Sequence, residues 1–178
     1  MHSIVFISLD AILSERHENS FRSFFALRRF GIRSEAQSLS EALVGASVAQ
    51  QLSLIVSENN PCFVVTSLHL PGVNRLQMQD HMKLMGLKAV GENLAEPWSI
   101  DVRRSTTRVD EISAWLTNHA GRGDTYAIID VEAFGQQIKG TCHKTHTVLI
   151  DSEHRRQNSL ASAVGAVLRA TSGGNPRA

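Results

Sequence analysis

The chain opens with the continuously apolar stretch Ile4-Val5-Phe6-Ile7, which is followed at once by Ser8-Leu9-Asp10. A run of this kind is typical of a central strand that is covered on both faces, as in a parallel sheet flanked by helices. In such sheets the side chains at the carboxyl end of the first strand face the ligand crevice. The sequence therefore places Ser8 and Asp10 where a buried strand gives way to a loop, and only one of the two is a carboxylate.

Strand-like and helix-like periods alternate along the rest of the chain, which predicts an α/β fold built on a parallel sheet. The apolar stripes predict helices at residues 19–30, 40–58, 76–87, 107–119 and 158–170. Further strands are expected at 61–67, 126–130 and 147–150, with a possible edge strand near 87–90. Residues 91–105 show no clear period.

Length and composition indicate one compact domain. The 178 residues are 42% hydrophobic and 20% charged, and a chain of this length forms one core rather than two. The formal net charge of +1 argues against a general nucleic-acid-binding surface. We expect a single domain over residues 1–170 and a mobile tail over 171–178.

Several other protein classes are disfavoured by the sequence. No apolar run approaches the roughly 20 residues that span a bilayer, and the first residues do not resemble a secretory signal. Cys62 and Cys142 are the two cysteines and give no disulfide framework. We therefore expect a cytoplasmic protein without membrane contact.

Three more segments carry recognisable patterns, and they follow the opening strand in a fixed order. They are Pro61–Ser67, an apolar strand that ends in hydroxyl side chains, the helix segment Arg108–Leu116, and Tyr126–Glu132, a strand that ends in acidic residues. Together with the opening strand, these segments resemble the haloacid dehalogenase (HAD) superfamily, and most closely its small, nearly capless Swiss Army Knife RNA-repair-like branch. The most specific local match is Arg108–Leu116. The resemblance implies a HAD-like Rossmannoid parallel sheet flanked by helices, with a minimal cap or none.

The resemblance also assigns positions to individual residues. Ser8 stands where the family has its nucleophilic Asp, and Asp10 stands at the acid/base position. Thr66, Ser67 and Arg108 fall at phosphate-binding positions. Asp130 and Glu132 fall in the metal-binding loop, where Val131 replaces the middle acidic residue.

These replacements matter because of the chemistry that the family performs. An Asp nucleophile attacks phosphorus while Mg²⁺ offsets the negative charge of both reactants. Ser8 offers no anionic oxygen, and the loss of carboxylates at Ser8 and Val131 weakens a site for Mg²⁺, which prefers oxygen ligands from carboxylates and water. We therefore expect a catalytically degenerate protein that acts by binding, with weak magnesium binding or none.

Alternatives remain open at each position. The competing function is a divergent Mg²⁺-dependent phosphohydrolase that uses Asp10, Asp130 and Glu132 on a phosphomonoester or a nucleic-acid end. Asp130 and Glu132 can equally cap the following turn, and Arg108 can equally be a solvated residue in the first turn of its helix.

The expected partner is an unknown phosphorylated ligand or a protein, and a homo-oligomer is left open. The aromatic group Phe21, Phe24, Phe25 and Phe30 either covers the sheet or forms a protein-binding face. Residues 142–146 contain Cys and His, but they lack a second ligand pair at zinc-finger spacing, which favours a polar turn.

Overall fold

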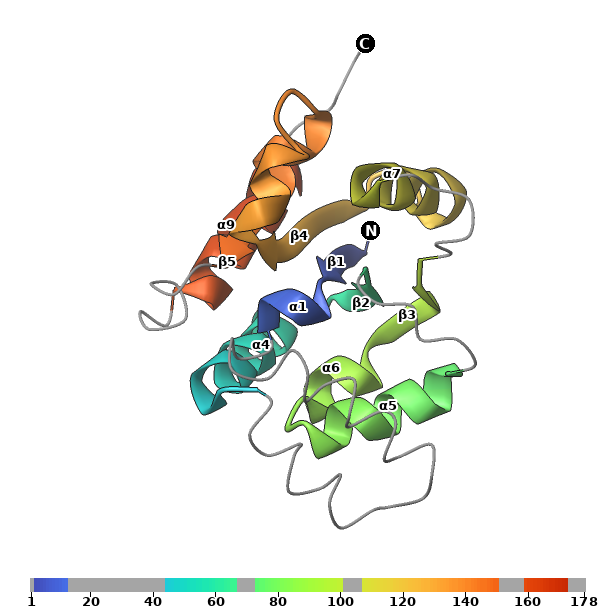
Figure 1. The fold of residues 1–178 in the computed structure, drawn as a ribbon, viewed down its shortest axis with the longest axis vertical. Helices are drawn as coiled ribbons and strands as arrows, with labels where there is room; N and C mark the ends of the chain where they lie inside the picture. Colours follow the sequence, from blue (N-terminus) through green and yellow to red (C-terminus); the bar gives the residue numbers. More distant parts are fainter. Residues whose placement is uncertain (1, 13–43, 67–72, 101–106, 151–158, 173–178) are drawn as a thin grey trace.

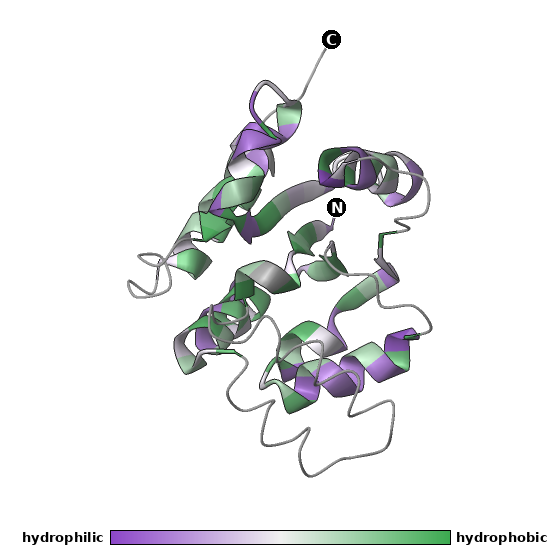
Figure 2. Cartoon of the chain, in the orientation of Figure 1, coloured by the Kyte–Doolittle hydropathy of each residue, from purple (hydrophilic) through white to green (hydrophobic). Residues whose placement is uncertain are grey.

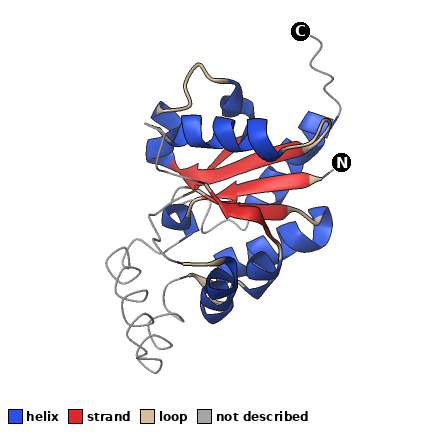
Figure 3. Cartoon of the chain, turned by 90° about the vertical axis from the view of Figure 1, so that its right-hand side faces the viewer, coloured by secondary structure: helices blue, strands red, loops and turns tan. Residues whose placement is uncertain are grey.

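The fold is a five-stranded parallel sheet with helices on both faces (Figures 1 and 3). The computed structural model describes residues 2–12, 44–66, 73–100, 107–150 and 159–172. The strands are β1 (Ser3–Ile7), β2 (Cys62–Val65), β3 (Leu94–Ser99), β4 (Thr125–Val131) and β5 (Thr147–Ile150). The α/β class and the parallel sheet predicted from the sequence are confirmed.

The helical elements in the described ranges alternate with these strands. They are α1 (Leu9–Ile12), α4 (Ala46–Asn59), α5 (Arg75–Leu84), α6 (Lys88–Glu92), α7 (Arg108–His119), the 3₁₀ helices η1 (Glu132–Gln136) and η2 (Cys142–His146), and α9 (Leu160–Ser172). None of these helices is both long enough and apolar enough to cross a membrane.

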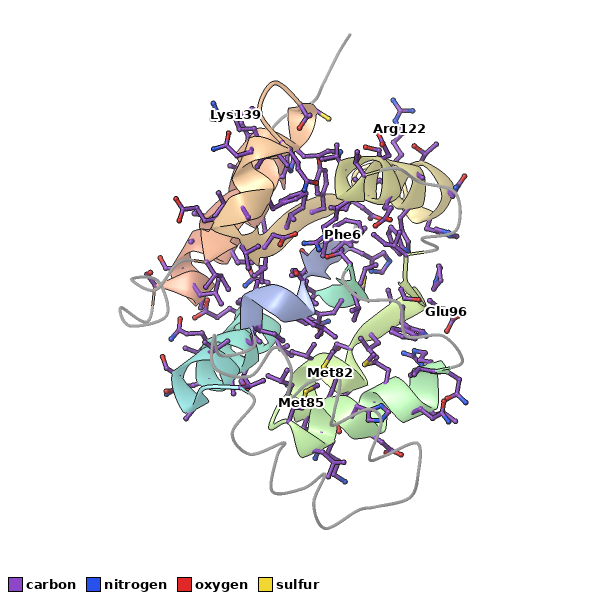
Figure 4. The ribbon with its side chains drawn as sticks, viewed as in Figure 1. Phe6, Met82, Met85, Glu96, Arg122 and Lys139 are labelled. Atoms are coloured by element: carbon purple, nitrogen blue, oxygen red, sulfur yellow. The ribbon has the colours of Figure 1, made fainter. Side chains whose placement is uncertain are left out.

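The two faces of the sheet bury two separate apolar clusters, because successive strand side chains point to opposite faces. Val5 and Ile7 of β1 belong to the cluster that packs against α4, α5, α6 and α9, and Met82 and Met85 contribute to it from the helix side. Ile4 and Phe6 belong to the cluster under α7 and η1. Figure 4 labels Phe6 beneath α7 and the two methionines near α5 and α6, and Figure 2 shows hydrophobic residues along the central strands.

The strand order is β3-β2-β1-β4-β5. The chain moves outward from β1 through β2 to β3, then crosses back over β1 and continues outward through β4 and β5. The direction of winding therefore reverses between β1 and β4. In open α/β sheets, ligands bind at the carboxyl ends of the strands beside such a reversal.

Helix α7 forms as the sequence predicts. Thr107 caps its first turn by accepting a hydrogen bond from the Asp110 N–H, which satisfies one backbone donor that the helix leaves unpaired. Trp115 is only 7% exposed, and its ring meets Phe6 edge-on at 5.4 Å. The indole N–H donates to the Pro97 carbonyl at 3.2 Å. The expected burial of Trp115 between helix and sheet is confirmed.

Several boundaries differ from the expectation. Helix α5 spans Arg75–Leu84 rather than residues 76–87. Helix α4 begins at Ala46 rather than at residue 40, because Gly45 is extended and forms its N-cap. The expected edge strand at 87–90 is wrong, since residues 88–92 form α6 and bury Val90 from a helical turn. Helix α9 continues through Ser172, two residues into the segment expected to be a tail.

The true edge strand, β3, lies in the segment that showed no period. Its pairing with β2 is irregular, with Phe63 opposite Leu94 but Val65 opposite Ser99. It also contains Pro97, which a sheet tolerates at an edge because proline has no N–H to donate. Because of the irregular pairing and the proline, the segment lacks the alternation of apolar and polar residues that predicts a strand. The helix expected at residues 19–30 lies outside the described residues. Its phenylalanines, and the question of whether it forms a cap, lie outside them too.

Candidate functional site

Three polar residues form a row across the carboxyl ends of β2, β1 and β4. Ile7 is in register with Val65 on one side and with Ile129 on the other, so the next residues along each strand, Thr66, Ser8 and Asp130, are neighbours. The Ser8 N–H donates to the Ile129 carbonyl at 2.9 Å, and the Thr66 N–H donates to the Ile7 carbonyl at 3.1 Å.

This polar row, Thr66–Ser8–Asp130, lies on the α7 face of the sheet. Its members continue the alternation of Val64, Phe6 and Ile128, which belong to the cluster under α7. All three residues are buried, and Ser8 and Asp130 have no exposed surface. A row of polar side chains without water needs internal partners.

Arg108 supplies most of those partners. It is the first residue of α7, and its Nη1 lies 2.6 Å from each carboxylate oxygen of Asp130 and 3.3 Å from Ser8 Oγ. The Asp130 side chain is fully buried, whereas the Arg108 side chain is 24% exposed. The sequence left open whether Arg108 binds an anion or is a solvated residue in the first turn of its helix; in the structure its guanidinium contacts Ser8 and Asp130.

Two further contacts hold the pair in place. The Val131 N–H donates to Asp130 Oδ1 at 2.8 Å. The guanidinium carbon of Arg108 lies 5.7 Å from the centre of the Phe134 ring, within the range of a cation–π interaction. Phe134 is buried in η1, directly after β4.

The contact to Arg108 defines what the Ser8 hydroxyl can do. A serine nucleophile needs a neighbouring base to take its proton. In the part of the chain that the structure describes, the hydrogen-bond partner recorded for Ser8 Oγ is the guanidinium, which donates a proton and accepts none. The geometry therefore supports Ser8 as an acceptor and not as an activated nucleophile.

Thr66 has the opposite property. Its Oγ1 is buried and makes no hydrogen bond within the described residues. A buried hydroxyl without a partner costs about 1–3 kcal/mol, so it stands out at the end of a strand where ligands bind. This favours Thr66 as a contact for a polar ligand atom. Ser67, the neighbouring phosphate-binding candidate, lies outside the described residues.

The residues at the metal-binding positions do not assemble a magnesium site. Asp130 is buried against Arg108, while Glu132 is exposed at the start of η1 and Val131 contributes no carboxylate. Among the described residues, no group of three or more His, Cys, Asp or Glu side chains is placed to hold a metal ion. Asp10 falls within α1, and its side chain is outside the described part. Among the described residues, Asp130 and Glu132 therefore do not come together as ligands for one Mg²⁺ ion.

A second polar cluster lies at the other end of β4 and was not found from the sequence. It consists of Ser113, Tyr126, His143 and His146, and we call it the histidine cluster. His143 is buried, with Nε2 2.7 Å from Ser113 Oγ and Nδ1 2.9 Å from the Tyr126 hydroxyl. His146 stacks on the Tyr126 ring at 3.9 Å. The segment expected to be a polar turn is η2, which carries both histidines.

The histidine cluster has a Ser–His–Tyr order that invites comparison with a catalytic triad. However, Ser113 Oγ donates its proton to the Val109 carbonyl at 2.8 Å, so His143 Nε2–H donates to Ser113 and Tyr126 donates to Nδ1. Ser113 also lies within α7, where the backbone N–H groups are engaged in the helix and cannot stabilise an oxyanion. The cluster is a structural network that joins α7, β4 and η2.

Burial shapes the ionisation of this cluster. It lowers the pKa of His143, with a further lowering from nearby His146. Burial likewise raises the pKa of Tyr126. Both groups therefore remain neutral at neutral pH, as their mutual hydrogen bond requires.

Comparison of the chain with protein-family models, with curated proteins and with solved structures found no match.

Proposed function

We propose that this chain is a HAD-like protein that has lost phosphoryl transfer and acts by binding a ligand or a protein partner. The observation that carries the proposal is the contact between Arg108 and both Ser8 and Asp130. In the resemblance, Ser8 stands at the nucleophile position and Asp130 at a metal position. Here one guanidinium binds both.

The chemical argument concerns charge and proton acceptance. Phosphoryl transfer through an enzyme carboxylate needs an anionic nucleophile and a cation that offsets its charge. Ser8 is neutral and hydrogen-bonded to a proton donor. The remaining carboxylate of the polar row, Asp130, is already neutralised by Arg108. In this proposal the site therefore has neither an anionic nucleophile at Ser8 nor a free carboxylate at Asp130 to hold the metal ion.

Binding is supported by the position and the chemistry of the crevice. The polar row lies beside the reversal of strand order between β1 and β4, where α/β sheets bind ligands. Thr66 offers a buried hydroxyl that has no hydrogen-bond partner within the described residues. A phosphorylated ligand held by Thr66, Ser67 and Arg108 suits these groups. A protein partner on residues 21–30 is the other form of the same proposal.

The alternative enzyme, a divergent Mg²⁺-dependent phosphohydrolase, requires more change. Arg108 would have to leave Asp130, and a fully buried carboxylate would then need a metal ion to balance its charge. No observation in the described residues favours that arrangement over the ion pair.

Turnover of generic phosphomonoesters in the presence of Mg²⁺ tests the proposal. We expect the purified chain to hydrolyse them no faster than a blank containing Mg²⁺. Ser8→Ala is the matched control, because activity that survives this substitution comes from elsewhere. Metal-dependent turnover that disappears in Ser8→Ala would show that the protein is an enzyme.

Binding is tested separately with inorganic phosphate and Thr66→Val, which removes the hydroxyl at nearly constant volume. We expect the substitution to weaken phosphate binding without lowering the melting temperature, since the hydroxyl has no hydrogen-bond partner to lose among the described residues. Thr117→Val, at an exposed position of α7, is the control for nonspecific effects. Equal phosphate affinity in all three proteins would remove the crevice from the proposal and leave the protein-partner form.

A further inference from the structure

We propose that Arg108 is the built-in cation of the crevice: its Nη1 occupies the point where a divalent metal ion would bind, so that ligand binding there needs no metal. The comparison with a metal ion rests on the proposed function, whereas the ion pair between Arg108 and Asp130 is observed directly.

The first support is the geometry around Nη1. Three oxygens converge on this one nitrogen, Asp130 Oδ1 and Oδ2 at 2.6 Å each and Ser8 Oγ at 3.3 Å. Arginine usually binds a carboxylate as a fork, with two nitrogens facing two oxygens. Here a single charged atom lies between both oxygens of one carboxylate, as a cation bound by a bidentate carboxylate does.

The second support is burial. Asp130 has no exposed surface, and a buried carboxylate needs a charge partner to remain ionised. Arg108 reaches it from the first position of α7, while the Phe134 ring lies against the guanidinium. A divalent ion at the same point would meet the guanidinium charge at close range, where repulsion is strong in a buried site.

Restoring the missing carboxylate alone should therefore not restore a metal site. In a Ser8→Asp variant, the added carboxylate lies next to Nη1 and binds Arg108 as Asp130 does. A metal ion gains access only when the guanidinium is removed as well. This differs from a site that lacks only carboxylates, for which Ser8→Asp together with Val131→Asp would be sufficient.

The first experiment asks whether charge or shape matters at position 108. Because the contact with Asp130 is made through Nη1, the charged Arg108→Lys should retain more of the melting temperature than the neutral Arg108→Gln, which should lower it by several degrees. Equal melting temperatures for the two variants would overturn the cation role.

The second experiment measures the shift in melting temperature that Mn²⁺ and Mg²⁺ cause in the wild-type protein and in variants at Ser8 and Arg108. We expect no shift in wild type or in Ser8→Asp, and a stabilising shift in Ser8→Asp combined with Arg108→Ala. A shift in wild type that Asp130→Asn abolishes would overturn the proposal, as would a shift in Ser8→Asp alone.

The two proposals fail in different ways. Metal-dependent turnover that is lost in Ser8→Ala contradicts the loss of catalysis, while a specific Mn²⁺ shift in wild type contradicts the built-in cation even if no turnover occurs.

Discussion

The two ends of β4 carry polar clusters of opposite character on the same face of the sheet. Tyr126 and Asp130 are four residues apart, about 13 Å along the strand, and both lie under α7. At the Tyr126 end, His143 and Tyr126 are neutral, and both ring nitrogens of His143 have partners. At the Asp130 end there is a buried charge pair, and Thr66 Oγ1 has no partner in the described residues.

The comparison separates structure from function. A hydrogen-bonded network in which both ring nitrogens of His143 are already paired stabilises the fold and offers a ligand no unpaired His143 nitrogen. A buried charge beside an unpaired hydroxyl is costly for stability, and such groups are retained where they serve binding or catalysis. The polar row is therefore the better candidate site, although the histidine cluster looks more like an enzyme centre.

The largest expected effect comes from the apolar cluster under α7, to which Trp115 belongs. Trp115→Ala should lower the free energy of unfolding by about 3–5 kcal/mol, because the ring is buried against Phe6 and its N–H bonds Pro97. Urea unfolding measures the loss. Leu76→Ala, at an exposed position of α5, is the control and should be nearly neutral. A near-neutral Trp115→Ala would mean that α7 faces the sheet differently.

A double-mutant cycle on Arg108 and Asp130 comes next in size. Arg108→Met should cost about 3 kcal/mol, near the lower end for a broken buried ion pair, since the Arg108 side chain is itself partly exposed. Adding Asp130→Leu should recover most of that loss. The cycle fails as evidence for a buried pair if the two effects simply add.

The histidine cluster should respond more weakly. Tyr126→Phe removes the hydrogen bond to His143 Nδ1 at almost constant shape, which should cost about 1 kcal/mol. The same substitution should leave phosphate binding unchanged, because it lies at the other end of β4. Weaker phosphate binding in Tyr126→Phe would show that the two clusters are coupled.

The smallest expected effect is a dependence of stability on pH. Burial lowers the pKa of His143 below its value of about 6.5 in the unfolded chain. The unfolded chain then binds the proton first, so the contribution of His143 is complete above pH 6.5 and is lost as the pH falls toward the folded-state pKa. Stability measured by urea unfolding at pH 7.5 and 5.5 should fall less in His143→Gln than in wild type.

The sequence predicts the fold well where the pattern is local. A few neighbouring residues are enough to predict three features: the strand at residues 4–7, the helix cap at Thr107 and the buried stripe that carries Trp115. Strand β3 fails this test because its irregular pairing and its proline depend on β2 as a neighbour. Helix α6 fails because a five-residue helix has too few turns to show a period.

The sequence predicted which residues belong to the polar row, but it did not predict the contacts between them and Arg108. Ser8, Thr66 and Asp130 each end an apolar run, so the rule for strand ends identifies them one at a time. Arg108 and Asp130 are 22 positions apart in the sequence. They meet only because of the strand order and the direction of α7, which no local pattern predicts. The contact between Tyr126 and His143 likewise arises from the turn that returns η2 to β4.

One measurement tests the built-in cation most directly: anomalous scattering from a crystal of the wild-type protein soaked in Mn²⁺ and phosphate. We expect no manganese peak beside Asp130, with Arg108 Nη1 still between the two carboxylate oxygens. A manganese ion bound to Asp130, with Arg108 displaced, would show that Arg108 is not the cation of this site and would favour the metal-dependent enzyme.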